Sequence, residues 1–344
     1  MTMVLLISLL FSTTAFFVMF NIKDRILKEV IFAYLVISVM LLAIFRIPEQ
    51  SSDYGNYVSI YNNLTKSWQI ELSMKLIVTL VRNTFNNVIF LFAFYAIFAV
   101  SIKGYVFKRI SIYPLVTLLA YIAYEYQVQE LTQIRMGLVV AFILLSIKPL
   151  YEKKYHLFML IGAIATFFHA SAITFVFLPF VCLFNTKRGL IIIFVGCLIA
   201  PFFISPIIKN LIPIIIPGGY LQHKIQQYAS DSKAITHTFR IATLYRYSIF
   251  LFLLYFSRQI LKYNKYFMHE MAMYIYGCLL NSLFFFVGLI SSRLSELYYP
   301  VEILLFPNML YIFKSKTFAK VLIIFLLLGE LIHEFYNLRP AYKF

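Results

Sequence analysis

The amino-acid sequence predicts an all-α fold, a polytopic bundle of about 12 transmembrane helices. Composition, hydropathy and the spacing of apolar runs support this prediction. Of the 344 residues, 62% are hydrophobic and only 13% are charged, whereas soluble domains are about 45 to 50% apolar. The mean hydropathy is +0.85. The apolar runs are long enough to cross a bilayer, and the polar connections between them leave no room for a soluble domain.

The apolar runs place the spans within a range of about ten to thirteen. The residues 1–344 are therefore expected to form a single transmembrane domain. One pair of spans, on either side of His169, can also be interpreted as one long tilted helix. The predicted spans cover residues 3–20, 29–46, 88–106, 111–126, 135–149, 155–168, 170–184, 189–205, 239–257, 271–290, 299–313 and 319–334.

Lys and Arg concentrate in the short connections along one side of this topology. Cytoplasmic loops carry an excess of Lys and Arg, so this side is expected inside, with the N-terminus and the C-terminus outside. The net charge of +16 then reflects topology, and no nucleic-acid motif accompanies it, so nucleic acid is not an expected partner. The basic connections are residues 21–28, 103–110, 148–154, 185–188, 258–270 and 314–320.

Two long outer loops, residues 47–87 and 205–238, are expected to form the substrate face. In the first, residues 70–82 have apolar residues at helical spacing, interrupted by Lys75 and Arg82. This pattern predicts a helix that lies in the membrane interface. The second loop is rich in Pro and Gly before a polar segment, which suits a lid or re-entrant element as well as a plain structural loop.

The densest polar group lies between the fourth and fifth predicted spans. Glu125, Gln129 and Gln133 recur every fourth residue, with Glu130 among them, so the three share one face if the segment is helical. Arg135 then opens the next span. A charge near the hydrocarbon centre costs about 2.5 to 3.5 kcal/mol on insertion scales, so an arginine facing a polar group indicates a site. The alternative is an arginine that snorkels to the interface.

Further arginines fall at or just inside the outer membrane boundary. Guanidinium groups bind phosphate oxygens bidentately and remain charged, so with Arg135 they suit a diphosphate ligand. For Arg293 the alternative is an ion pair with Glu296 at i, i+3. These arginines are Arg46, Arg240, Arg246 and Arg293.

His169 is the leading candidate for a general base if the protein is an enzyme, because neutral imidazole accepts a proton from a hydroxyl near pH 7. A lone histidine beside aromatic residues is, however, more often structural. Asp53, Glu130 and Glu296 are the fallback bases. The other histidines show no metal-ligand spacing with His169 or each other, so neither a metal nor another cofactor is expected.

Tyrosines follow Asp53 in the first outer loop at a spacing of three to four residues. Tyrosines at a membrane boundary usually form an aromatic belt, but the same rings also stack on sugar faces. Tyr54 and Tyr57 are therefore candidate substrate-binding residues, together with Tyr298 and Tyr299 after Arg293.

Five short motifs follow one another across nearly the whole chain. They are Asp53-Tyr54 with Tyr57, Gln133-Ile134-Arg135 with Gly137-Leu138, Phe168-His169-Ala170-Ser171-Ala172, Arg293-Leu294-Ser295 with Tyr298 or Tyr299 and Pro307, and Arg339-Pro340-Ala341-Tyr342-Lys343. In their order and spacing these motifs resemble the EpsG/Wzy family of polysaccharide repeat-unit polymerases, which are multi-span proteins of the bacterial inner membrane.

The resemblance implies transfer of a growing glycan from undecaprenyl diphosphate to a new lipid-linked repeat unit on the outer face of the cytoplasmic membrane. The partners would be undecaprenyl-diphosphate-linked oligosaccharides and the bilayer, with a flippase and a chain-length regulator as further partners. An inverting displacement needs one base and cationic donors for the departing diphosphate, and no metal is obligatory. The predicted roles are base for His169 and diphosphate binding for Arg135 and Arg293.

Two other functions fit parts of the pattern. A flippase for lipid-linked sugars would also place arginines and tyrosines around a cavity, but it needs access from both faces, whereas the polar groups here lie almost wholly outside. A membrane acyltransferase acting on sugars would need inner-face chemistry for its donor, and the inner loops are short connectors.

Overall fold

The computed structural model describes residues 2–20, 22–48, 51, 53–63, 71–215, 241–286 and 288–337. Over these residues it contains helices and no strand, which confirms the predicted all-α fold. The chain divides into two compact units. The first unit comprises Met1–Ala170 and Ile303–Phe344, and the second comprises Ser171–Glu302.

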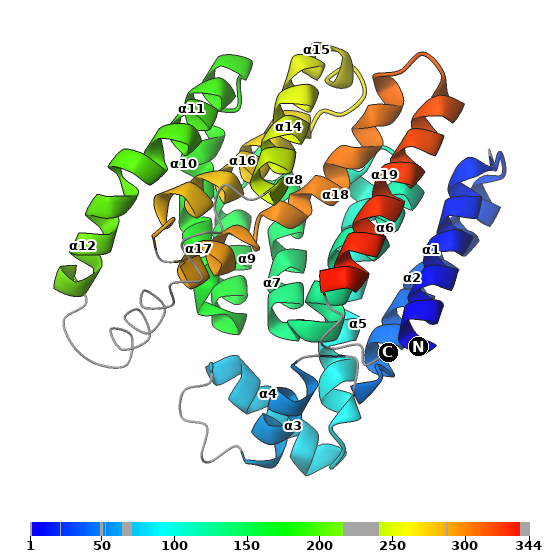
Figure 1. Cartoon of the computed structure of the whole chain (residues 1–344). Helices are drawn as coiled ribbons and strands as arrows, with labels where there is room; N and C mark the ends of the chain where they lie inside the picture. The colour runs from blue at the N-terminus through cyan, green and yellow to red at the C-terminus, as the bar shows by residue number, and fades with distance from the viewer. Residues whose placement is uncertain are drawn as a thin grey trace. The chain divides into compact units, whose positions relative to one another are not determined.

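In the first unit, α5 and α7 form the centre. α5 packs against α2 and α7, and α7 packs against α9, while α19 packs against α1 and η3. The short helices α3 and α4 lie at one end of α5 (Figure 1). The elements are α1 (Thr2–Met19), α2 (Arg25–Ile44), α3 (Tyr54–Asn62), α4 (Leu72–Thr84), α5 (Ile89–Ile110), α6 (Pro114–Ala120), η3 (Tyr121–Glu125), η4 (Gln127–Thr132), α7 (Ile134–Leu145), α8 (Ile147–Tyr151), α9 (Tyr155–Phe168), η8 (Phe306–Tyr311) and α19 (Lys316–Asn337).

In the second unit, α16 is the central helix. It packs against α10, α11, α14 and α17, and most of its residues between Phe267 and Ser282 are buried. The elements are η5 (Ala170–Phe177), α10 (Leu178–Cys182), α11 (Lys187–Phe203), α12 (Ser205–Ile215), α14 (Ile241–Tyr255), α15 (Ser257–Ile260), α16 (Phe267–Leu283), α17 (Gly288–Ser295) and η7 (Tyr299–Val301), followed by α18 (Glu302–Leu305) where the units divide.

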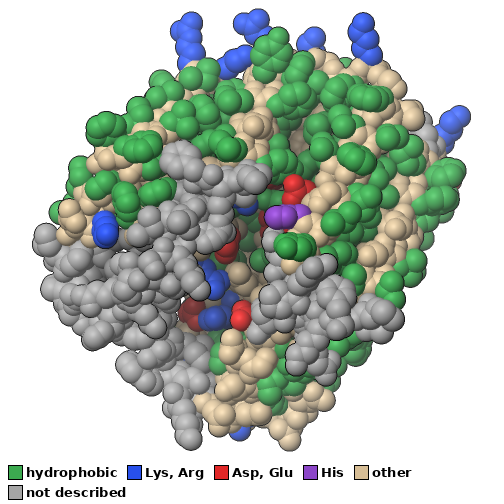
Figure 2. Space-filling model, in the orientation of Figure 1, with side chains coloured by type: hydrophobic (Ala, Val, Ile, Leu, Met, Phe, Trp, Pro, Cys, Tyr) green, Lys and Arg blue, Asp and Glu red, His purple; other side chains and the backbone are tan. Residues whose placement is uncertain are grey.

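The surface identifies a membrane protein. Large apolar side chains such as Leu9, Ile26 and Phe325 are exposed, and hydrophobic side chains cover much of the face in Figure 2. So many exposed apolar side chains are stable only when lipid or another apolar partner covers them. Among the described residues, 3 helices are long and apolar enough to cross a membrane, or up to 4 if α11 and α12, bent by 56°, form one span. The total of about 12 spans and the side of the termini remain predictions.

Several local predictions are confirmed. The amphipathic segment at residues 70–82 is helix α4, which buries Met74, Ile77, Val78 and Val81 at helical spacing. The spans before and after His169 are separate helical segments, because α9 ends at Phe168 and His169 is extended, with φ −154° and ψ 122°.

Two local predictions were wrong. Residues 103–110 form the end of α5 instead of an inner loop, and Lys103 is fully buried there because a carboxylate from η4 neutralises it. Residues 299–313 do not form a regular span but successive short turns, η7, α18 and η8. Pro300 and Pro307 explain the breaks, since proline has no N–H to donate within a helix.

Candidate functional site

A shared apolar core fixes α3 and α4 against the other helices of the first unit. Tyr57 and Tyr61 of α3 and Met74 and Val78 of α4 are buried together with residues of α5 and α7. Their spacing of three to four residues places each pair on one helical face. This core holds the residue that precedes α4, Glu71, close to the first turn of α7.

Glu71 joins Arg135 and His169. Arg135 Nη1 donates a hydrogen bond to Glu71 Oε2, which forms an ion pair. The other carboxylate oxygen, Oε1, lies 3.4 Å from His169 Nδ1. This separation is long for a hydrogen bond, so the contact is mainly electrostatic. The side chains of Arg135, Glu71 and His169 are 26%, 24% and 19% exposed, so a ligand can reach all three. We call them the Glu71 triad.

The positive partners of Glu71 lower the pKa of its carboxyl group. Burial alone raises the pKa of the Glu71 carboxyl, but the contacts with His169 and Arg135 outweigh burial and lower the pKa to about 2. Glu71 is therefore ionised at neutral pH. The pKa of the Tyr57 hydroxyl is raised, chiefly by burial, although Arg135 beside it acts in the opposite direction. Tyr57 thus contacts the same guanidinium as Glu71.

His169 is positioned by the end of α9. Its backbone N–H donates to the carbonyl of Ala165 at 3.0 Å, which places it directly after the last helical turn. The preceding Phe168 packs against Tyr95 and Phe142, with ring centroids 6.3 and 6.0 Å apart. Within the part of the chain that the structure describes, no group of three or more His, Cys, Asp or Glu side chains could hold a metal ion.

The polar segment before Arg135 forms two short π-helices, η3 and η4. The wide turn is visible in the backbone bond from Gln133 N–H to the carbonyl of Val128, which spans five residues at 2.7 Å. Gln129 Nε2 donates to Glu125, as the spacing predicted. Gln133, however, lies beyond η4 and caps α7, so it does not share the face of the other two.

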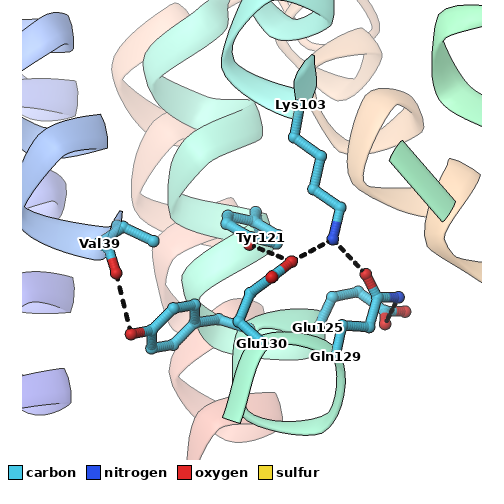
Figure 3. Close-up of polar contacts among 7 residues, drawn as sticks. Val39, Lys103, Tyr121, Glu125, Gln129 and Glu130 are labelled. Atoms are coloured by element: carbon cyan, nitrogen blue, oxygen red, sulfur yellow. Dashed lines mark hydrogen bonds and ion pairs between the residues drawn. The ribbon is translucent and has the colours of Figure 1, made fainter. Parts of the chain in front are cut away.

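Lys103 reaches this segment from α5 (Figure 3). Its Nζ donates to Gln129 Oε1 at 2.6 Å and forms an ion pair with Glu130 Oε1. The Tyr121 hydroxyl donates to the same Glu130 oxygen at 2.8 Å. The side chains of Lys103 and Glu130 are each 1% exposed. Removing a charge from water costs several kcal/mol per ion, so each ion of this pair requires the other.

Gly137 lets η4 approach the first turns of α7. A Cβ atom at this position would lie 2.7 Å from the backbone oxygen of Gln129 and 3.3 Å from Glu130 Oε1. The first distance is closer than any side chain tolerates, so the close approach of η4 to α7 requires glycine here.

The remaining predicted residues of the first unit lie close to this segment. Arg46 is only 6% exposed. Its Nη1 donates to the carbonyl of Leu131 at 3.0 Å, and its guanidinium lies 4.3 Å from the centre of the Phe92 ring. The Tyr54 ring stacks on the same Phe92 ring, with the two ring centroids 5.1 Å apart. Asp53 directly precedes α3, and its carboxylate accepts a hydrogen bond from the Asn56 side chain at 3.2 Å.

The second unit contains the other predicted residues. The guanidinium of Arg246 lies over the Tyr299 ring at 3.9 Å, and the Tyr298 hydroxyl shares a hydrogen bond with Thr174 at 2.8 Å. Arg293 in α17 and the nearby Glu296 are partly buried. Arg240 lies outside the described residues. The structure therefore groups Arg135 with His169, and it places Arg246 and Tyr299 together within the second unit.

Glu71 and Lys103 were not among the predicted site residues. Glu71 had a signal in the sequence, since it opens the amphipathic segment of the first outer loop. An acidic residue directly before a helix, however, is also common outside functional sites, because a negative charge is favourable near a helix N-terminus. Lys103 resembled the other lysines that end a span, and only its partner 27 residues later distinguishes it.

The sequence model of the EpsG family matches residues 29–339. The chain belongs to the EpsG family. This match covers nearly the whole protein, and it includes the Glu71 triad, Lys103 and the segment η4. As an EpsG-family member with apolar helices, the protein is a membrane protein of polysaccharide synthesis with a polymerase type of function. A search of curated proteins returns no match, and neither does a search of solved structures.

Proposed function

We propose that this EpsG-family protein is a glycosyltransferase that joins lipid-diphosphate-linked oligosaccharide repeat units. The reaction takes place on the outer face of the bacterial cytoplasmic membrane, with undecaprenyl diphosphate as the carrier. The observation that supports this proposal best is the Glu71 triad, in which one carboxylate contacts both a partly exposed guanidinium and a partly exposed imidazole.

His169 acts as the general base. The negative charge of Glu71 faces Nδ1, so it favours the tautomer that carries its proton there and leaves the lone pair on Nε2. Carboxylate and histidine work in the same way in hydrolytic triads, where the acid orients the imidazole and stabilises its protonated form. The base then removes the proton from the acceptor sugar hydroxyl.

The bond changes are those of a single displacement. The acceptor oxygen forms a bond to the anomeric carbon of the growing glycan while the bond from that carbon to the diphosphate oxygen breaks. The hydroxyl proton passes to His169, and the lipid diphosphate departs as an anion. Attack opposite to the leaving group inverts the anomeric centre. Diphosphate is a good leaving group, so cationic donors suffice to stabilise it.

Arg135 provides one such donor in the first unit. Its guanidinium has five N–H groups in a fixed fork, so it can bind Glu71 and still present donors to phosphate oxygens. For Arg293, Arg246 and Arg240 we propose diphosphate binding from the sequence pattern. Arg46 is less suited to this role than the others, because its contacts with backbone carbonyls and Phe92 bury it. We assign it to holding η4.

The sugar-binding residues are proposed from exposure and chemistry. Tyr54, Asp53 and Gln133 are partly buried in the first unit, where their rings and polar groups can contact a repeat unit. In the second unit we propose Glu296 and the Tyr298 and Tyr299 segment. Gln129 and Glu130 support the site from within the protein. A flippase that delivers repeat units and a regulator of chain length are the proposed partner proteins.

Incubation of the purified protein in nanodiscs with one lipid-linked repeat unit tests this function. A polymerase produces a ladder of glycans on a gel, each band larger by one repeat unit. In sealed vesicles a flippase instead moves the lipid-linked sugar across the bilayer without changing its length. A ladder that is lost in the Arg135→Ala/Arg293→Ala variant, with normal membrane insertion, supports the proposal. Transport without a ladder, or an unchanged ladder in the variant, contradicts it.

A further inference from the structure

The buried pair of Lys103 and Glu130 connects α5 to the π-helix that precedes Arg135. The ammonium of Lys103 contacts two consecutive residues of η4, with Nζ 2.6 Å from Gln129 Oε1 and paired with Glu130 Oε1. Contact with two neighbours along a helix fixes its rotation as well as its distance from α5. In Figure 3 both side chains of η4 converge on this one ammonium.

The π-helical turn needs such external contacts. A π-helix is rare and usually occurs as a single turn within an α-helix, often at a functional site. Here the i, i+5 pattern continues to the bond between Gln133 and Val128, and Thr132 Oγ1 bonds to the carbonyl of Gln127 at 3.2 Å. Without the contacts from Lys103, relaxation to an α-helix would change the register of every residue after Glu130.

Arg135 depends directly on this register. It lies five residues after Glu130, and only the cap residue Gln133 separates η4 from α7. Gly137, one half-turn further, touches the backbone of Gln129, so η4 and the start of α7 pack as one piece. A rotation of η4 therefore moves the guanidinium of Arg135 away from Glu71.

We propose that Lys103 is a positioning residue of the active site, which acts through Glu130 and η4 to place Arg135 against Glu71. This inference rests on the proposed glycosyltransferase function. Lys103 does not touch the substrate. It fixes the register of the segment that carries the diphosphate-binding arginine.

The variant Lys103→Met/Glu130→Met separates positioning from stability. Replacing both members of a buried ion pair by apolar residues is often neutral for folding, whereas removing one member is strongly destabilising. We expect the double variant to melt near the wild-type temperature and Lys103→Met to melt lower. Because a misplacement of about 1 Å can lower a rate about 10²-fold, we expect kcat of the double variant to fall about 100-fold despite its stability.

The effect of Glu71→Gln on kcat, compared between the wild type and the double variant, tests positioning directly, because a purely structural role of Lys103 would leave that effect unchanged. In the wild-type background, Glu71→Gln should lower kcat at least about tenfold, because it removes a group in contact with Arg135 and His169. In the double-variant background Arg135 no longer meets Glu71, while the contact of Glu71 with His169 remains. The same substitution should therefore lower kcat by a clearly smaller factor than in the wild-type background, as expected when two changes remove one shared interaction.

The exposed ion pair of Lys108 and Glu29 provides a matched control. It also links α5 to another helix, at 2.9 Å, but its side chains are 50% and 46% exposed. Lys108→Met/Glu29→Met should keep kcat within about twofold of wild type, because exposed pairs contribute little. If the Lys103 double variant does not insert, Lys103→Arg is used, with an expected loss of kcat of about tenfold, since the planar fork cannot reproduce both ammonium bonds.

The outcomes separate the two proposals. No ladder from the wild type contradicts the glycosyltransferase function itself. A wild-type ladder together with normal kcat in the Lys103→Met/Glu130→Met variant, or in Lys103→Arg, overturns the positioning role and leaves the function standing. An undiminished effect of Glu71→Gln in the double variant also overturns it.

Discussion

Arg135 donates a hydrogen bond from Nη1 to Oε2 of Glu71, which lies 64 residues earlier in the chain. The two residues come from different elements, since Glu71 directly precedes the amphipathic helix α4 and Arg135 lies in the first turn of the apolar helix α7. Their contact makes the start of α4 part of the helical site. It also brings a carboxylate to the histidine that the sequence indicated as a base.

Replacement of Glu71 by Gln should lower kcat at least about tenfold, because the neutral amide no longer favours a protonated imidazole. The initial rate of ladder formation in nanodiscs measures this effect. Glu152→Gln is the control, since Glu152 forms ion pairs with two lysines that are 49% and 56% exposed. Equal rates for Glu71→Gln and Glu152→Gln would remove Glu71 from the catalytic site.

The stability that the Glu71 carboxylate provides should be lost in acid. Its pKa is lowered from 4.5 to about 2, because His169 and Arg135 outweigh the opposing effect of burial. A lowered pKa means that this contribution is present above 4.5 and is lost as the pH falls towards 2. The difference in melting temperature between wild type and Glu71→Gln should therefore shrink as the pH falls below 4.5. A difference that stays unchanged between pH 4.5 and 2 would contradict the lowered pKa of Glu71.

Arg135→Lys should lower the rate of polymerisation about tenfold, although it preserves the charge. A lysine ammonium is a point donor and cannot bind a carboxylate and phosphate oxygens through a planar fork. The control is Arg82→Lys, because Arg82 is exposed at the end of α4. Comparable rates for the two variants would indicate that only the charge at position 135 matters.

Gly137→Ala should destabilise the protein by about 1 to 2 kcal/mol, because overpacking against a backbone atom exceeds the helix-propensity gain of alanine. The matched control is Gly329→Ala in α19, where a Cβ meets no atom within 4 Å. That variant should be more stable than wild type by about 0.5 to 1 kcal/mol. Thermal unfolding in detergent compares the two. A melting temperature that rises in both variants would contradict the close packing of η4 on α7.

The helical content could be predicted from the sequence because the apolar runs are long and their ends are marked by charges or prolines. The first outer loop was also predictable in part, since the spacing of residues 70–82 indicated an amphipathic helix that is α4. The buried position of Lys103 within α5 could not be predicted in this way. A lysine near the end of an apolar run is typical of a loop, and only a buried carboxylate in a distant segment stabilises it inside a helix.

The candidate site was predictable only as a set of residue types. Arg135 and His169 were identified because a charged or titratable residue in an apolar setting is rare. The pairing of both with Glu71 depends on tertiary contacts across 64 residues and could not be read from spacing. Likewise, the sequence predicted Gln133 on the same face as Glu125 and Gln129 from an α-helical period. The segment is π-helical instead, and this register separates Gln133 from the other two.

The most direct test of the catalytic role of the Glu71 triad is the single-turnover rate of His169→Gln with a bound lipid-linked donor and acceptor. His156→Gln, an exposed position earlier in α9, is the control. We predict that His169→Gln binds the donor normally but transfers it about 10² to 10⁴ times more slowly, as expected for loss of a general base. Transfer by His169→Gln at the rate of the His156→Gln control would contradict this assignment of the active site.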